Sequence, residues 1–430
     1  MMISYERFRY LVAGKKNIIW LVNVGAEKYW HDLPNTLNGD SDNFISQIEG
    51  INIALAKEDD YIIVSELPDD EYLRYLEENG FNIPMFLQTY RYNGKSLSES
   101  VLSDNKLIDF LKSKKDDYVF VPYAVTLYEE QIASATGLKM VGGCHNASKL
   151  INDKVFARKL AQKLDFLTTD GAILNDEREA LKYYNNFLCE RKCILKSSHG
   201  ASGKGLLIFH NENQLKIIIK TIDAFRTGDD FILERWYDEK TDFNYQFIIT
   251  DTGKVVAFSI KEQIMSGVKY IGSVIPARIS KELVEKICAY ATIIGQALFE
   301  FGYSGIANVD AIYTGNGFIP IIEINGRFSL STYISFVCEK FSVKHAIVKY
   351  YDIYMLSSVL LFKEFEQKLN FLKSKDGKMI ILNYCVNKEK NSNGKHKCRF
   401  FLLYLGDSLE SLNELVKETE KYLKMNYNWR

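Results

Sequence analysis

Residues 193–209 read CILKSSHGASGKGLLIF, and the rest of the chain can be interpreted around this stretch. An apolar run ends at Lys196, a loop of small residues follows, and a second apolar run resumes at Leu206. The pattern predicts a glycine-rich hairpin between two strands. Glycine lets backbone N–H groups approach an anion closely, and Lys196 and Lys204 add positive charge. Two interpretations stay open: an ordinary turn, or a flap that binds phosphate.

The loop differs from both familiar phosphate-binding motifs. A P-loop needs G-x-x-x-x-G-K-S/T at the start of a helix, whereas Lys204 is followed by Gly205 and a strand-like run. The G-x-G-x-x-G spacing of dinucleotide-binding folds is also absent. A nucleotide at this loop is therefore expected to lie between two sheets, with the loop as a movable cover.

Composition narrows the class of protein. The chain has 430 residues, of which 47% are hydrophobic and 25% charged, as expected for a globular protein of several domains. Its net charge of −1 argues against nucleic acid as a partner. No apolar run approaches the roughly 18 residues of a membrane span, and the N-terminus lacks a signal-like apolar segment, so we expect no membrane partner and a cytoplasmic location. The seven cysteines suit reduced thiols.

The order of apolar segments predicts four domains. Short buried-strand patterns at 17–22, 61–65 and 118–121 alternate with helical patterns, which indicates a parallel α/β domain over residues 1–145. One helix over 147–164 and the hairpin region make an α+β lid over 146–230. Antiparallel strand patterns, including one at 231–236, and a helix over 280–301 form a third unit over 231–350, with helix expected again from 330 to 349. A β–β–α appendage completes the chain over 351–430.

A second chemical signal lies in two strand patterns. Asp310 stands in IANVDAIY and Glu323 in PIIEINGRF, both among apolar residues. A buried carboxylate is costly unless it is paired or bound to a metal, and adjacent antiparallel strands would bring these two together. Asn325 shares the face of Glu323 because strand side chains alternate. The set predicts an oxygen-ligand site for Mg²⁺ beside Arg327.

Taken in order, these features resemble the ATP-grasp ligase superfamily from about residue 146 to 330, and the N-terminal part resembles its pre-ATP-grasp domain. The resemblance implies a Rossmann-like α/β domain followed by a two-lobed ATP-grasp fold and a small C-terminal appendage, in a chain of α/β and α+β class. Asp242 stands where the family usually has Glu. The implied nucleotide-binding residues are Lys154, Lys196, Ser202, Gly203, Lys204, Gly205, Glu234, Arg235, Trp236 and Asp242. The implied metal ligands are Asp310, Glu323 and Asn325, and the implied catalytic residues are Arg327, Lys261 and Arg278.

The resemblance also implies a reaction. ATP with Mg²⁺ or Mn²⁺ would activate a small-molecule carboxylate as an acyl phosphate, and an amine acceptor would complete a peptide-type bond. One alternative is transfer to the phosphopantetheine thiol of an acyl carrier protein, for which the basic loop 388–397 (KEKNSNGKHK) is a candidate contact and a solvated loop the plainer interpretation. Another is a non-catalytic ATP sensor, against which the intact charged set argues. The resemblance also allows a homodimer.

Overall fold

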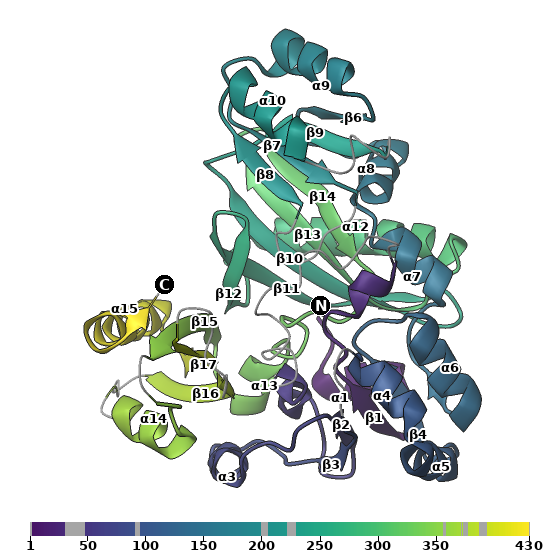
Figure 1. Cartoon of the computed structure of the whole chain (residues 1–430), viewed down its shortest axis with the longest axis vertical. Helices are drawn as coiled ribbons and strands as arrows, with labels where there is room; N and C mark the ends of the chain where they lie inside the picture. Colours follow the sequence, from purple (N-terminus) through teal and green to yellow (C-terminus); the bar gives the residue numbers. More distant parts are fainter. Residues whose placement is uncertain are drawn as a thin grey trace.

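The computed structural model describes residues 2–30, 48–90, 95–198, 205–221, 229–355, 358–370, 372, 377–386 and 394–429. Figure 1 shows a lid above a long sheet and the N-terminal domain below it, and the C-terminal unit lies at one end of the same sheet. Within the described ranges, no helix is long and apolar enough to cross a membrane.

The N-terminal domain is the predicted parallel α/β unit. Its five strands pair in the order β3-β2-β1-β4-β5, and every described pair is parallel. The chain leaves β1 toward β2 on one side and later returns to β4 on the other, so the carboxyl ends of β1 and β4 border a crevice where α/β folds usually bind ligands. The strands are β1 Asn17–Leu21, β2 Tyr61–Val64, β3 Met85–Gln88, β4 Tyr118–Pro122 and β5 Lys139–Met140. The helices are α1 Tyr5–Ala13, α3 Asp70–Glu78, α4 Leu97–Ser103, α5 Asn105–Ser113 and α6 Leu127–Thr136.

The lid is built on a four-stranded sheet in the order β6-β9-β7-β8. The predicted hairpin is confirmed, because β7 and β8 pair in antiparallel register around the small-residue loop. β9 belongs to this sheet, although the sequence places that segment at the start of the third unit. The lid buries its own apolar cluster, which includes Leu195, Phe209 and Leu233. The strands are β6 Gly171–Leu174, β7 Cys193–Ser197, β8 Leu206–Phe209 and β9 Phe231–Arg235, with helices α9 Glu177–Tyr183 and α10 Glu212–Thr221.

The helix predicted over 147–164 is wrong as a single element. It is two helices, α7 His145–Ile151 and α8 Lys154–Lys163. Asp153 separates them, because its carboxylate accepts hydrogen bonds from the backbone N–H groups of Val155 and Phe156 and so begins a new helix. Lys154 therefore stands at the first position of α8.

A nine-stranded sheet joins the third unit to the C-terminal segment. Its order is β14-β13-β10-β11-β12-β15-β17-β16, and β18 pairs with β15. The predicted helix over 330–349 is wrong beyond the short α13, because Ala346, Ile347 and Val348 are buried in a strand between β12 and β17. The strands are β10 Thr241–Ile249, β11 Val255–Ser266, β12 Lys269–Ile275, β13 Gly305–Thr314, β14 Gly317–Asn325, β15 His345–Met355, β16 Gly377–Val386, β17 His396–Gly406 and β18 Asn428–Trp429. The helices are α12 Lys281–Glu300, α13 Val337–Phe341, α14 Phe362–Leu369 and α15 Leu409–Asn426.

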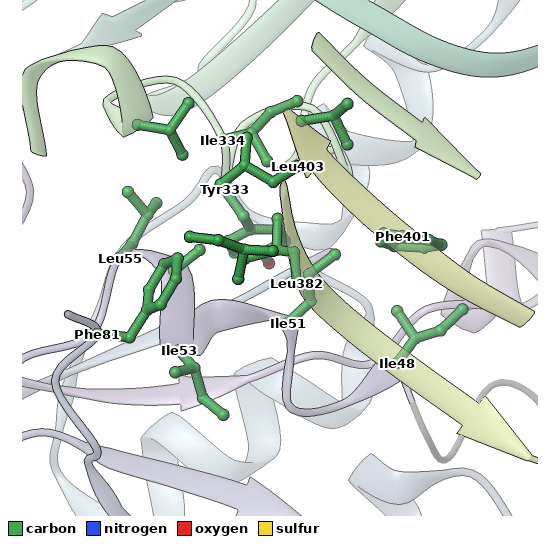
Figure 2. Packing of buried hydrophobic residues seen from close by; sticks show 14 of the residues in the cluster. Ile48, Ile51, Ile53, Leu55, Phe81, Tyr333, Ile334, Leu382, Phe401 and Leu403 are labelled. Carbon is green, nitrogen blue, oxygen red and sulfur yellow. The ribbon is translucent and has the colours of Figure 1, made fainter. Parts of the chain in front are cut away.

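The C-terminal unit shares a core with the N-terminal domain. Figure 2 shows Ile51 and Phe81 of that domain packed in one cluster with Leu382 of β16 and Leu403 of β17. The Tyr72 hydroxyl of α3 also donates a hydrogen bond to the carbonyl of Leu382 at 2.7 Å. The β–β–α arrangement is as predicted, but it is not detached, because β15 runs across the expected division at 350/351.

Candidate active site

Asp310, Glu323 and Asn325 lie on one face of the hairpin formed by β13 and β14. Asp310 is directly opposite Glu323 in the antiparallel ladder, and Asn325 is opposite Asn308. Residues directly opposite in a ladder share a face and lie about 5 Å apart. The structure thus brings together the three oxygen-bearing side chains that the sequence predicted as a set.

The surroundings of Asp310 raise the pKa of its carboxyl group. Its Oδ1 accepts hydrogen bonds from Asn244 Nδ2 at 2.8 Å and from Gln263 Nε2 at 3.0 Å. Burial, and next the nearby charge of Glu323, raise the pKa of Asp310 from its ordinary 3.8 to about 7. The two amide donors lower the pKa but do not offset burial and repulsion.

This donor set fits a divalent cation. Two carboxylates held side by side repel each other, and a cation between them would remove that repulsion while accepting their oxygens as ligands. The amide oxygen of Asn325 adds a neutral oxygen ligand of the type that Mg²⁺ accepts. Among the described residues no group of three or more His, Cys, Asp or Glu side chains offers an alternative metal site.

The raised pKa of Asp310 predicts pH-dependent metal binding. Mg²⁺ requires the ionised carboxylate, so its apparent affinity should fall about tenfold for each pH unit below 7 and level off above 8. The stability of the metal-free protein should change with pH in the opposite direction. The folded state binds the Asp310 proton more tightly than the unfolded state does, so the free energy of unfolding should fall as pH rises from about 4 to about 7. Mg²⁺ titrations of the protein with nucleotide at pH 6, 7 and 8 would measure the first effect. An affinity independent of pH would show that Asp310 is not a ligand.

Two buried lysines lie at the junction of lid and sheet. Lys154 Nζ is 3.0 Å from Glu323 Oε1, and Lys154 is 3% exposed. The backbone N–H of Lys154 also donates to the carbonyl of Ser198, just after β7. Lys196 Nζ contacts Glu234 Oε1 across the β7–β9 pair. Both ammonium groups are therefore held in place by carboxylates.

Glu234 is the centre of a buried polar cluster in the lid. Lys196 contacts one carboxylate oxygen of Glu234, Oε1. The other, Oε2, accepts a hydrogen bond from the Thr169 hydroxyl and lies 3.5 Å from Arg158 Nη1. Burial disfavours the ionised carboxylate, but Lys196, Thr169 and Arg158 outweigh it and hold the pKa of Glu234 below its ordinary value. Glu234, a predicted nucleotide-binding residue, is thus an anion held between two cations.

Gly171 permits this cluster. A Cβ at this position would lie 2.4 Å from Glu234 Cβ and 2.6 Å from the carbonyl oxygen of Leu233, so the β6–β9 pair would have to separate. We expect Gly171→Ala to lower stability by about 1 to 3 kcal/mol and to weaken nucleotide binding, since overpacking shifts the backbone. Gly315→Ala, where a Cβ meets nothing within 4 Å, is the matched control. Thermal unfolding of both variants is the measurement, and equal melting temperatures would contradict the prediction.

The other predicted nucleotide contacts are only partly described. The backbone N–H groups of Arg235 and Trp236 donate to the carbonyls of Asp170 and Lys192, so in this structure both are already bonded within the lid. The Asp242 carboxylate pairs with Lys240. Gly205 begins the second half of the hairpin at φ +77, a backbone conformation that favours glycine. The predicted flap residues Ser202, Gly203 and Lys204 lie outside the described residues.

Arg327 links the predicted metal ligands to the N-terminal domain. Its Nη2 donates to Asn325 Oδ1 at 2.9 Å, and its Nη1 donates to the Tyr123 hydroxyl at 2.8 Å. Its Nε lies 3.4 Å from Glu27 Oε1. Tyr123 follows β4 and Glu27 lies just beyond β1, so Arg327 reaches the crevice between those strands.

The other two predicted catalytic residues lie on different faces of the sheet, and only Lys261, directly opposite Asn244, shares the face of Asp310. Lys261 has no exposed surface, and its Nζ donates to the hydroxyls of Ser259 at 2.6 Å and Ser335 at 2.9 Å. Burial holds the pKa of the Lys261 amine well below its ordinary value. Arg278 pairs with Glu262, which faces α12 on the opposite side of the sheet from Asp310. Lys261 therefore shares a face with Asp310, two strands away, whereas its pair with Glu262 holds Arg278 on the other face.

Sequence reasoning missed several residues of this site. They are Asn244 and Gln263 on Asp310, Arg158 and Thr169 on Glu234, and Glu27 and Tyr123 on Arg327. A signal existed for the first pair, because polar residues recur at every second position over 242–246 of β10 and over 259–263 of β11. No local pattern marks Glu27 or Tyr123, whose role follows from domain packing.

Comparison with known proteins places these features in a family. Residues 159–342 match the family model described as the ATP-grasp domain. The chain is 25% identical over 334 residues to the butirosin acyl-carrier protein L-glutamate ligase of Niallia circulans, covering 74% of each chain. It is 29% identical over 175 residues to the D-alanine–D-alanine ligase of Campylobacter lari, covering 38% of this chain and 48% of that protein.

A solved structure agrees on the fold. The biotin carboxylase of Campylobacter jejuni in complex with β,γ-ATP superposes with a TM-score of 0.58 at 15% identity, over 96% of this chain and 92% of that one. The family match covers most of the lid and the strands that carry Asp310 and Glu323, while Lys154, Glu27 and Tyr123 precede it. The chain therefore contains an ATP-grasp domain, and its relatives include ATP-grasp ligases.

Proposed function

We propose that this protein is an ATP-dependent ligase that activates a carboxylate as an acyl phosphate and joins it to an amine acceptor. One observation carries the proposal: two opposed, half-buried carboxylates and an amide share a face, with Lys154 3.0 Å from Glu323 and Arg327 hydrogen-bonded to Asn325. Such a cluster of opposite charges is costly in a core and useful where phosphate groups are handled.

The proposed roles follow from charge. Asp310, Glu323 and Asn325 would hold Mg²⁺ or Mn²⁺, which when bound would neutralise phosphate oxygens. Lys154 and Lys196 would offset the remaining phosphate charge at the junction of lid and sheet. Arg327 would orient the substrate carboxylate beside the crevice of the N-terminal domain. The lid, with its own core, could close as a unit and keep water from the mixed anhydride.

The proposed reaction has two steps. A carboxylate oxygen of the substrate attacks the γ-phosphorus of ATP, an O–P bond forms, and the bond to the bridging oxygen breaks, releasing ADP. The acceptor nitrogen then attacks the acyl carbon and loses a proton. The C–O bond to the phosphate breaks, and inorganic phosphate leaves.

A second candidate is transfer of the acyl group to a thiol on an acyl carrier protein. The observation that favours it is the similarity, over 74% of both chains, to a ligase whose name includes an acyl-carrier protein and L-glutamate. Both candidates use the same first step and differ only in the nucleophile.

The test is ADP release from ATP over a panel of amino acids and other small carboxylic acids, first with hydroxylamine to capture the acyl phosphate. Acid-dependent ADP and hydroxamate would support carboxylate activation. Peptide or amino acid amines and a thiol-bearing carrier then compete as acceptors, and product formed only on the carrier would overturn the amine proposal. If no acid in the panel led to ADP release, the activation proposal would be refuted and a nucleotide sensor would be favoured.

A further inference from the structure

The two carboxylate oxygens of Asp310 have different surroundings. Oδ1 accepts two hydrogen bonds, from Asn244 Nδ2 at 2.8 Å and from Gln263 Nε2 at 3.0 Å. Oδ2 accepts none from any residue that the structure describes. A carboxylate oxygen has about two lone-pair positions, so the two amide donors fill Oδ1. Only Oδ2 is left to ligate a cation.

Both donors approach Asp310 from the same side of the sheet. The strand order places β14 on one side of β13 and β10, followed by β11, on the other. Asp310 of β13 is directly opposite Glu323 of β14 and directly opposite Asn244 of β10, and Gln263 lies on β11. The two amides therefore hold the carboxylate from the side away from Glu323. This leaves Oδ2 for a cation shared with Glu323 and Asn325.

A second layer of hydrogen bonds fixes the orientation of Asn244. Its Oδ1 accepts a hydrogen bond from Gln246 Nε2 at 2.6 Å, and the same nitrogen donates to Ser331 Oγ at 2.8 Å. Because Oδ1 is the acceptor in this bond, Nδ2 is the end of the amide that faces Asp310. Asn244 is 3% exposed and Gln246 has no exposed surface, so both bonds form away from bulk water. The Asn244 donor is thus held in place before any cation binds.

We propose that Asn244 and Gln263 are positioning residues that limit Asp310 to one metal-ligating oxygen and thereby favour Mg²⁺ or Mn²⁺ over Ca²⁺. The inference rests on the metal-dependent carboxylate activation proposed above. Mg²⁺ requires a nearly ideal octahedron and binds few protein oxygens in addition to phosphate and water, whereas Ca²⁺ takes more ligands and accepts both oxygens of one carboxylate. A carboxylate whose second oxygen is already occupied suits the smaller ion.

Gln263→Met is the first test, because Gln263 is half-buried and its amide bonds only Asp310 among the described residues. The substitution keeps the length of the side chain and frees one lone pair of Oδ1. Titration of the full-length protein with Mn²⁺ in the presence of ADP, followed by electron paramagnetic resonance of the free ion, should show an affinity lowered about tenfold. The affinity for ADP without metal should stay unchanged. Asn244→Leu should weaken Mn²⁺ binding by a similar factor.

Competition by Ca²⁺ distinguishes positioning from other causes. When Oδ1 of Asp310 is free to join Oδ2, the ratio of Mn²⁺ affinity to Ca²⁺ affinity should fall at least about threefold in Gln263→Met. Protonation of Asp310 or a looser sheet would weaken the binding of both ions alike. Equal losses of Mn²⁺ and Ca²⁺ affinity would therefore overturn the proposal, as would an unchanged Mn²⁺ affinity in Gln263→Met.

Two substitutions outside the site are matched controls. Gln88→Met on β3 removes the hydrogen bond from Gln88 Nε2 to the carbonyl of Ser65, at 3.2 Å. Asn383→Leu on β16 removes a buried amide that accepts a hydrogen bond from Cys385 at 2.7 Å, and so reproduces the loss of a buried strand amide in Asn244→Leu. Both controls should bind Mn²⁺ and Ca²⁺ as the wild-type protein does.

The hydroxamate assay separates this inference from the proposed function. Hydroxamate from the wild-type protein, together with unchanged Mn²⁺ binding in Gln263→Met, would refute the positioning role and leave carboxylate activation standing. If the wild-type protein formed no hydroxamate but Gln263→Met showed the expected changes in metal binding, the positioning role would be supported and the activation refuted. A wild-type protein that bound ADP but no Mn²⁺ would refute both.

Discussion

Glu323→Gln is expected to lower acid-dependent ADP release by about 100- to 1,000-fold, the range seen when a charge-stabilising group is removed from an active site. The amide keeps the shape of the side chain but removes one of the two carboxylates that would hold Mg²⁺. It also takes away the anion 3.0 Å from Lys154 Nζ, so the lysine loses a partner that orients it. Nucleotide binding should survive in large part, because Lys196 and the lid are untouched.

The measurement is ADP release at saturating acid, with binding of a fluorescent nucleotide analogue in parallel. Glu300→Gln, at the exposed end of α12, makes the same chemical change away from the site and should retain wild-type turnover. Raising the Mg²⁺ concentration should restore part of the lost rate if Glu323 acts through the metal. Unchanged turnover in Glu323→Gln would remove this residue from the proposed metal set.

Lys196→Met is expected to have the second large effect, and on two properties at once. The substitution leaves the Glu234 carboxylate buried with Thr169 and the more distant Arg158, and breaking a buried pair in this way costs about 3 kcal/mol. It also removes a cation from the proposed phosphate site. We therefore expect a less stable lid together with nucleotide binding weakened at least about tenfold.

Two further variants separate these effects. Lys159→Met breaks the exposed pair with Asp230, at 2.9 Å, and should change stability by less than about 1 kcal/mol. Lys196→Met combined with Glu234→Gln removes the stranded charge, so stability should recover while nucleotide binding stays weak. If the double variant recovered nucleotide binding as well, Lys196 would be a structural partner of Glu234 rather than a phosphate ligand.

Strand patterns in the sequence predicted much of the fold and part of the candidate site. The apolar runs near β1, β2 and β4 predicted a parallel sheet, because strands buried on both faces are continuously apolar. The hairpin of β7 and β8 followed from one glycine-rich interruption between two apolar runs. Asp310 and Glu323 stood out because carboxylates are rare among buried strand residues, and alternation put Asn325 on their face.

Other features were not predictable from local pattern. The break between α7 and α8 depends on Asp153, a polar residue equally compatible with a continuous helix surface. Local pattern predicts helix where β15 lies, because the burial of β15 comes from β12 and β17, and β17 lies far away in the sequence. Arg278 was predicted as a catalytic residue, but its ion pair with Glu262 holds it on the α12 side of the sheet.

By itself, the sequence determined which residues must be buried, which backbone segments could form strands, and which buried charges needed partners. These properties depend on side-chain chemistry and short-range periodicity, so they can be read from neighbouring residues. Only the tertiary structure decided which charges meet: Lys196 with Glu234, Lys154 with Glu323, Arg327 with Glu27, and Asp352 with three cations. Strand order and domain packing set those contacts, because electrostatic interactions depend on distances in space that no local pattern encodes.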